Sequence, residues 1–287
     1  MGTSNAYSGP VGPNTLLPPW APPLDRVDDE TSDPGDGEAG PDQEDSTPND
    51  VAVLPTTPNP WRAPKDAMTR FARTGGLGAN GRRQFRRAAR GFVRAQGGAG
   101  GATRSSSAGR ATARGLGGFL SSAATSGVAA AARQFGLAYV GQDVDAFFVA
   151  LVDAIAPAGA LAEEAVAHAA AAETVEELFE KYAVRDAGLE VLNALTPEAI
   201  RDAVERYVAV YINTRLMHVL ASRLEDGTNS SLQAYRMERD VKRYIVERVE
   251  LEFEAADALN IDWSGSEGRQ VVDGIFREGF ALLERWQ

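Results

Sequence analysis

The sequence predicts an all-α protein in which a helical body follows an N-terminal tail without regular structure. Apolar residues in the C-terminal part recur at helical spacing, and no segment shows the alternation typical of a strand. The N-terminal part instead combines prolines with acidic residues. Apolar residues make up 44% of the 287 residues, which is enough for a hydrophobic core.

Charge divides the chain into three parts, although the overall net charge is −11. Residues 1–60 hold eleven acidic residues, one basic residue and 12 of the 15 prolines. Residues 61–118 hold thirteen basic residues, one acidic residue and 13 glycines, and residues 119–287 hold 15 basic and 28 acidic residues. We therefore expect a disordered acidic Pro-rich tail, an Arg/Gly-rich segment with short helices, and a helical domain.

Helix signals follow one another along the second and third parts. In the Arg/Gly-rich segment, helices are predicted for residues 64–74 and 82–96. Glycines 97–101 are expected to end the second helix, and a Ser/Gly/Ala-rich linker carrying Arg104, Arg110 and Arg114 is expected to follow. In the body, helices are predicted for residues 119–135, 144–156, 160–172, 175–183, 187–195, 197–227, 231–259 and 269–286.

The helix over residues 197–227 has the clearest boundaries. Thr196 is a good N-cap and Pro197 suits the first helical position, while Asp226-Gly227 predicts the end. Its apolar stripe consists of Ile200, Val204, Tyr207, Val208, Tyr211, Ile212, Leu216, Val219 and Leu220.

Composition excludes several kinds of site. The chain has no cysteine, which rules out disulfides, thiol nucleophiles, zinc knuckles and iron–sulfur clusters. Only two histidines, His168 and His218, are present. No run of 18 apolar residues occurs and the N-terminus lacks a secretory signal, so we expect a cytoplasmic protein without a membrane partner.

The sequence contains no convincing catalytic, cofactor or metal motif. Residues 76–81 match GxGxxG, but no strand is predicted before them, so we interpret them as a glycine hinge. Glu164 and His168 are one helical turn apart and are expected to form a surface pair, and His218 is expected to be structural. The acidic runs at residues 176–180 and 250–257 are expected to be solvated, with Glu177 pairing with Lys181. We expect a protein that is not an enzyme and that needs no cofactor or metal.

Two less polar stretches of the tail, residues 16–20 and 51–61, place apolar side chains in a proline-rich context. Such stretches are already extended, so they lose less entropy on entering a groove of a partner. The predicted partner-binding residues of the first stretch are Leu16, Leu17, Pro18, Pro19 and Trp20.

The arginines of residues 61–118 are the strongest compositional signal. The predicted contacts with phosphate or an acidic partner are Arg82, Arg83, Arg86, Arg87, Arg90 and Arg94. If the partner is a nucleic acid, Phe71, Phe85 and Phe92 are available to stack on bases. The alternatives are an acidic protein partner, the acidic tail or body of the same chain, and a solvated linker, and the acidic net charge argues against a dedicated nucleic-acid binder.

The N-terminus resembles that of the B component of the Qat anti-phage defence system. The resemblance lies in Met1-Gly2-Thr3-Ser4, in Gly9-Pro10 and in the stretch from Leu16 to Ala21. The order of an acidic Pro-rich spacer, an Arg/Gly segment over residues 81–88 and a helical body is also similar. The resemblance spans the chain in organisation, and it is specific in the first 21 residues and in the Arg/Gly segment.

The resemblance implies three neighbouring proteins as partners: an ATPase, a protein similar to a 7-deazaguanine-forming synthase, and a protein similar to a TatD-type nuclease. It implies a non-enzymatic adaptor whose N-terminus the synthase-like protein modifies. Gly2 would be the acceptor, its α-amine freed by removal of Met1, with Thr3 and Ser4 fitting a narrow active site. The alternative function is a nucleic-acid-binding accessory protein that uses the Arg/Gly segment.

Overall fold

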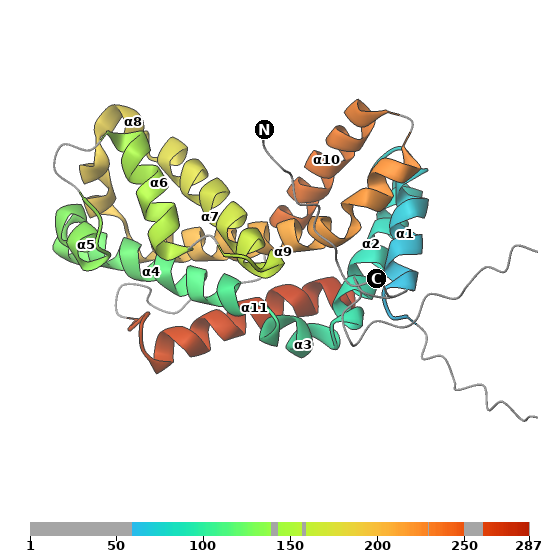
Figure 1. The fold of residues 1–287 in the computed structure, drawn as a ribbon, viewed down its shortest axis with the longest axis horizontal. Helices are drawn as coiled ribbons and strands as arrows, with labels where there is room; N and C mark the ends of the chain where they lie inside the picture. Colours follow the sequence, from blue (N-terminus) through green and yellow to red (C-terminus); the bar gives the residue numbers. More distant parts are fainter. Residues whose placement is uncertain (1–58, 139–142, 157–158, 229, 250–260, 287) are drawn as a thin grey trace, which may run out of the picture. The chain divides into compact units, whose positions relative to one another are not determined.

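The computed structural model describes residues 59–138, 143–156, 159–228, 230–249 and 261–286. These ranges form helices and contain no strand, which confirms the all-α prediction (Figure 1). Nearly all of the acidic Pro-rich tail predicted for residues 1–60 lies outside the described residues. The described helices belong to one unit, residues 57–287, which is separate from residues 1–56.

The helices, in chain order, are α1 (Arg62–Ala72), α2 (Ala79–Ala95), α3 (Gly98–Arg104), α4 (Ser107–Ser126), α5 (Val128–Gln134), α6 (Val144–Ile155), α7 (Ala162–Lys181), α8 (Val184–Ala187), the 3-10 helix η1 (Leu189–Ala194), α9 (Pro197–Gly227), α10 (Ser231–Val249) and α11 (Ser266–Arg285).

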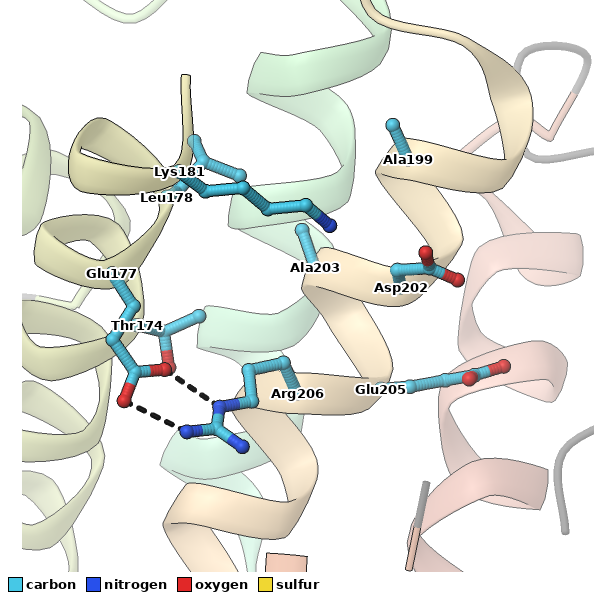
Figure 2. Close-up of a pocket in the computed structure, with 9 residues that line it drawn as sticks. All are labelled: Thr174, Glu177, Leu178, Lys181, Ala199, Asp202, Ala203, Glu205 and Arg206. Carbon is cyan, nitrogen blue, oxygen red and sulfur yellow. Dashed lines mark hydrogen bonds and ion pairs between the residues drawn. The ribbon is translucent and has the colours of Figure 1, made fainter. Parts of the chain in front are cut away.

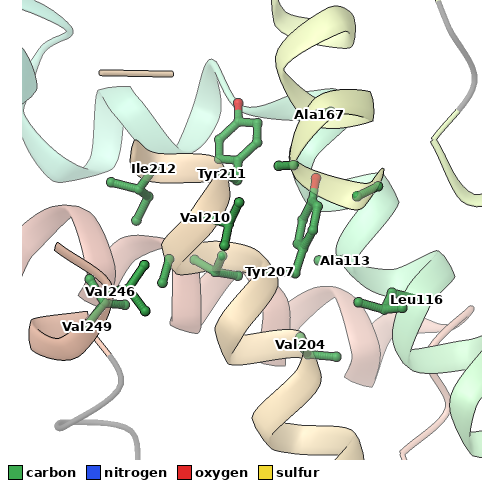
Figure 3. Packing of buried hydrophobic residues seen from close by; sticks show 14 of the residues in the cluster. Ala113, Leu116, Ala167, Val204, Tyr207, Val210, Tyr211, Ile212, Val246 and Val249 are labelled. Carbon is green, nitrogen blue, oxygen red and sulfur yellow. The ribbon is translucent and has the colours of Figure 1, made fainter. Parts of the chain in front are cut away.

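Helix α9 is the element around which the others pack. It contacts α1, α4, α7, α10 and α11 (Figure 1). The six consecutive residues 207–212 are all fully buried, so apolar side chains leave this helix in every direction and not only along the predicted stripe. Tyr207 and Tyr211 lie beside Ala113 of α4 and Ala167 of α7, whereas Ile212 lies toward Val246 of α10 (Figure 3).

Glycines in α4 let large rings approach its backbone. A Cβ at Gly109 would lie 2.5 Å from the ring of Tyr211, and a Cβ at Gly117 would lie 2.6 Å from the ring of Trp263. The predicted break after residue 96 is confirmed, because α2 ends at Ala95 and Gly97 has a φ of 87°. The Ser/Gly/Ala-rich linker predicted to follow it is wrong. Residues 98–104 and 107–126 are helices of the core, and their glycines serve close packing.

The structure also revises several helix boundaries. The helix predicted for residues 119–135 is divided at Gly127, whose φ of 87° suits glycine. The two helices predicted for residues 160–172 and 175–183 are one helix, α7, because no residue between them breaks the backbone ladder. The segment 187–195 is mostly the 3-10 helix η1, and helix α10 is described only as far as Val249 of the predicted 231–259.

The Arg/Gly-rich segment is not packed separately from the body. Helices α1 and α2 pair with each other, α1 also contacts α9, and α2 and α3 contact α11. The ring of Phe85 on α2 lies 6.2 Å from that of Tyr244 on α10 and 6.1 Å from that of Trp286, which follows α11. These aromatic contacts join the start of the described chain to its end.

The carboxylate of Glu163 on α7 organises the start of α4. It accepts hydrogen bonds from the backbone N–H groups of Ala108 and Gly109, each at 2.9 Å, and from the hydroxyl of Tyr211 at 2.7 Å. A carboxylate at a helix N-terminus satisfies unpaired N–H donors and interacts favourably with the helix dipole. Burial raises the pKa of Tyr211 well above its ordinary value, so this hydroxyl stays protonated and donates to Glu163.

Arg215 of α9 joins this junction to the end of α3. Its guanidinium donates to the hydroxyl of Ser105 at 2.8 Å, to the hydroxyl of Ser106, and to the carbonyl of Ala102 at 3.2 Å. The turn between α3 and α4 is therefore held by side chains from α7 and α9.

We expect Gly117→Ala to lower the free energy of unfolding by about 1–3 kcal/mol, because the added methyl group collides with the ring of Trp263. Gly118→Ala is a matched control in the same helix, since its Cβ would meet its nearest neighbours at 3.6 Å. This control should raise the free energy of unfolding by about 0.5–1 kcal/mol through helix propensity. Urea unfolding of both variants measures the difference, and equal values would contradict the close approach of α4 to Trp263.

We expect Glu163→Gln to lower the free energy of unfolding by about 1–3 kcal/mol, because α4 loses its charged cap and Tyr211 loses a charged acceptor. Glu180→Gln, an exposed change on the same helix, should leave the free energy of unfolding unchanged within about 0.5 kcal/mol. Chemical denaturation followed by circular dichroism checks both values. Equal stability of the two variants would show that Glu163 is not a significant cap.

Candidate interaction surface

A groove with an arginine rim lies between α1 and α2. We call it the α1–α2 groove; it has a volume of about 440 Å³ and is lined by Pro60, Ala63, Pro64, Ala67, Arg70, Arg87, Arg90, Gly91, Arg94 and Ala95. Proline, alanine and glycine form the apolar part of the lining, and four guanidinium groups supply the charge. A narrow apolar groove with guanidinium groups suits an extended, anionic segment.

Three of these arginines are available to a ligand. Arg70, Arg87 and Arg94 are exposed and form no ion pair or hydrogen bond with the described part of the chain through their side chains. Arg90 differs because it is half-buried and donates to the backbone carbonyl of Trp286. The positions 87, 90 and 94 follow helical spacing, so these three side chains form one row on α2.

The other arginines of α2 that were predicted contacts differ in their exposure and in their hydrogen-bond partners. Arg82 donates to the carbonyl of Leu77 and Arg83 to the side chain of Asn80, each at 2.9 Å, and both are exposed. Arg86 is half-buried. The structure thus brings Arg87, Arg90 and Arg94 into the lining of the α1–α2 groove and leaves Arg82, Arg83 and Arg86 outside it. Arg70 was not among the predicted contacts, because its position beside α2 depends on the pairing of the two helices.

The predicted aromatic contacts with bases are wrong. Phe71, Phe85 and Phe92 are each 0% exposed and belong to the hydrophobic core. Phe71 packs against Phe85 with ring centroids 5.4 Å apart, and Phe92 lies against Trp61 at 6.0 Å. Their spacing marked the buried face of α2, and a buried ring offers no face to a base.

Of the arginines of the predicted linker, Arg110 and Arg114 lie on α4, and the exposed Arg104 is the last residue of α3. Arg110 of α4 forms an ion pair of 2.6 Å with Asp273 of α11. Burial and the neighbouring Arg110 lower the pKa of Arg114, which lies one turn further along α4. Arg110 therefore joins α4 to α11, and the prediction that it lies in a linker is wrong.

The GxGxxG segment, residues 76–81, spans the end of the turn between α1 and α2 and the first three residues of α2. Gly75 and Gly76 have positive φ angles, and Gly78 is the N-cap of α2. The preceding described element is helix α1 and not a strand. This arrangement lacks the strand–turn–helix context of a dinucleotide site, and the glycine hinge stays a prediction.

A second cavity, of about 400 Å³, lies between α7 and α9 (Figure 2). Arg206 of α9 binds the carboxylate of Glu177 on α7 in a bidentate manner, with N–O distances of 2.6 and 2.8 Å. Glu177 was expected to pair with Lys181, which instead extends toward α9 without an ion pair to a described residue. Glu177 and Arg206 satisfy each other, and the other cation among the described lining residues, Lys181, lies over the ring of Tyr182 with Nζ 5.7 Å from the ring centroid.

The histidines take structural or surface positions. His168 forms a 3.0 Å contact through Nε2 with Asp153 of α6, and not with the predicted Glu164, whose carboxylate accepts from the backbone of Leu161. His218 is exposed on α9. No group of three or more potential metal ligands occurs among the described residues.

The predicted N-terminal site lies outside the described residues. It comprises the acceptor Gly2, its neighbours Thr3 and Ser4, and the docking residues Leu16, Leu17, Pro18, Pro19 and Trp20. The acidic run over residues 250–257 also lies there. In the described ranges, no helix is long and apolar enough to cross a membrane.

A family model for the Qat anti-phage system associated protein QatB matches residues 97–283. The chain belongs to the QatB family. Its role is therefore in Qat anti-phage defence, as the resemblance of the N-terminus implied. The match covers α3 to most of α11, whereas α1, α2 and the α1–α2 groove precede it. No curated protein and no solved structure matches the chain.

Proposed function

We propose that this QatB-family protein is a non-enzymatic adaptor that binds acidic segments of other Qat proteins through its α1–α2 groove. The observation that carries the proposal is the exposed set of Arg70, Arg87 and Arg94 on an apolar groove. Guanidinium groups hold carboxylates by two parallel hydrogen bonds, so several of them in a row favour an acidic peptide. Partners of this adaptor are the ATPase, the synthase-like protein and the TatD-like nuclease of the system.

We further propose that the N-terminus is the part on which a partner acts. Gly2 precedes the described unit by 57 residues, which span up to about 190 Å when extended. A segment of this length reaches an active site while the helical unit stays bound elsewhere. Leu16 to Trp20 anchor the segment on the synthase-like protein, and the α-amine of Gly2 is the acceptor of the modification.

We expect the chain purified from the intact Qat operon to be heavier than the chain expressed alone, with the added mass on the N-terminal peptide that contains Gly2. Intact-mass and peptide mass spectrometry measure this difference. In the operon, Leu17→Ser with Trp20→Ala should abolish both the mass increase and the copurification of the synthase-like protein. An unmodified N-terminal peptide from the active system would refute the role of Gly2 as acceptor.

Leu17 and Trp20 lie outside the described helical unit, so their replacement should leave its melting temperature unchanged. If the double variant still copurified with the synthase-like protein but showed no increase in mass, the partner would dock on the helical unit and not only on the tail.

One observation favours the alternative function, a nucleic-acid-binding accessory protein. Arg82, Arg83, Arg87 and Arg94 are exposed on a single helix, α2, where phosphates have access to them. The burial of Phe85 and Phe92 leaves this alternative without stacking partners on α2. The acidic tail also repels a phosphate backbone, so we favour the adaptor.

We expect the full chain not to bind duplex DNA measurably at about 0.15 M salt, because its net charge is −11. Fluorescence anisotropy with a labelled duplex, repeated over a series of salt concentrations, tests this. Binding that weakens steeply with salt, and whose log–log slope falls by about 2–3 in the Arg83→Gln, Arg87→Gln, Arg94→Gln variant, would replace the adaptor with the alternative. The control changes Arg133, Arg269 and Arg277, exposed arginines on other helices, to Gln.

A further inference from the structure

The α1–α2 groove lies where the described chain begins. Pro60, one of its lining residues, is the second described residue of the chain. The segment that precedes it, residues 25–50, contains eleven acidic residues and one basic residue. The most negatively charged segment of the sequence therefore precedes, in the same chain, a groove whose Arg70, Arg87 and Arg94 lack side-chain partners among the described residues.

We propose that residues 25–50 of the same chain occupy the α1–α2 groove when no partner is bound. The groove is then covered from within the molecule. An acidic segment of another Qat protein binds by displacing this internal one. The inference concerns the free chain, so it does not depend on the modification of Gly2.

The dimensions of the groove fit this occupant. Arg87 and Arg94 are seven helical residues apart, which corresponds to about 10 Å along α2. About three residues of extended chain cover this distance. Acidic residues recur at this interval or closer in two groups, Asp33, Asp36 and Glu38, and then Asp42, Glu44 and Asp45.

The chain that connects the acidic residues to the groove is long enough to reach it and short enough to keep them near it. From Asp50 to Asn59 there are nine residues, which span at most about 30 Å. The acidic residues thus reach the rim of the groove without strain. Such a short tether also keeps them at an effective concentration of about millimolar or higher near the arginines.

The charges of the helical unit do not already neutralise the rim. Arg70, Arg87 and Arg94 have no ion pair with a described residue, and the one acidic residue on α1, Asp66, lies near Arg62 instead. Each exposed ion pair is weak by itself and is screened by salt. Occupancy of the groove therefore depends on many acidic residues that take turns in pairing with a few arginines. This occupancy must decline as the ionic strength increases.

Because the chain has no cysteine, a single introduced cysteine carries one spin label at a chosen position. In the full-length chain, Gly37→Cys puts the label between Asp36 and Glu38. Amide signals of a ¹⁵N-labelled sample are compared with the label oxidised and reduced. We expect loss of signal for amides of α1 and α2 in the oxidised sample, and no loss for α5, which contacts α4 and η1 but neither α1 nor α2.

Two changes should restore the lost signals. One is about 1 M salt, at which the screening length falls to about 3 Å. The other is the Arg70→Gln, Arg87→Gln, Arg94→Gln variant. The control variant with Arg133, Arg269 and Arg277 changed to Gln removes the same charge from exposed positions elsewhere and should keep the loss on α1 and α2.

A further variant leaves the helical unit untouched. It replaces all eleven acidic residues of residues 25–50 by Asn or Gln, and it should restore the α1 and α2 signals even if the arginine variant folds poorly. Signals of α1 and α2 that are no weaker than those of α5 in the starting chain would overturn the proposal. A loss that persists after neutralisation of these eleven acidic residues would overturn it as well. None of these outcomes involves a partner, so the adaptor proposal is tested separately.

Discussion

The complete burial of the middle of α9 is the constraint on which the rest of the structure depends. Six consecutive residues from Tyr207 to Ile212 are fully buried, so helices must cover this part of α9 on all sides. Helices α4, α7, α10 and α11 supply that cover, and glycines at positions 109 and 279 allow the closest approaches. Close packing here determines where the ends of the surrounding helices lie, and hence which groups are left for binding.

The same helix also positions the candidate interaction surface. At its C-terminal end, a Cβ at Gly227 would lie 2.5 Å from the Cβ of Ala72, so α1 packs directly against the end of α9. The ring of Phe85 then fixes α2 against Tyr244 and Trp286. With its apolar face used in this way, α2 turns Arg87 and Arg94 outward beside Arg70 of α1. The groove is a consequence of how these two helices are held.

Helix α2 has an apolar face that packs in the core and a basic face that points outward, which explains why a basic helix is part of an acidic protein. Its phenylalanines are buried in the core, whereas Arg87 and Arg94 are exposed and have no side-chain partner among the described residues. The chain contains an acidic segment shortly before the groove, and a QatB-family protein acts in a system of several components. Competition between an internal and an external acidic segment is a simple way to make binding depend on the presence of the right partner.

The sequence by itself determined the helical class, the buried face of α2 and both ends of α9, because helical periodicity, the N-cap Thr196 with Pro197, and the helix-ending Asp226-Gly227 pair act locally. Only the tertiary structure decided that the glycines of α4 pack against rings, since a glycine in a helix and a glycine in a linker look alike until the neighbour is known. The same holds for Glu163, which caps a helix 54 residues away from it in the chain. The α1–α2 groove likewise needs Arg70 and Arg87 from two helices, and their pairing depends on contacts with α9 and α11 that no local pattern contains.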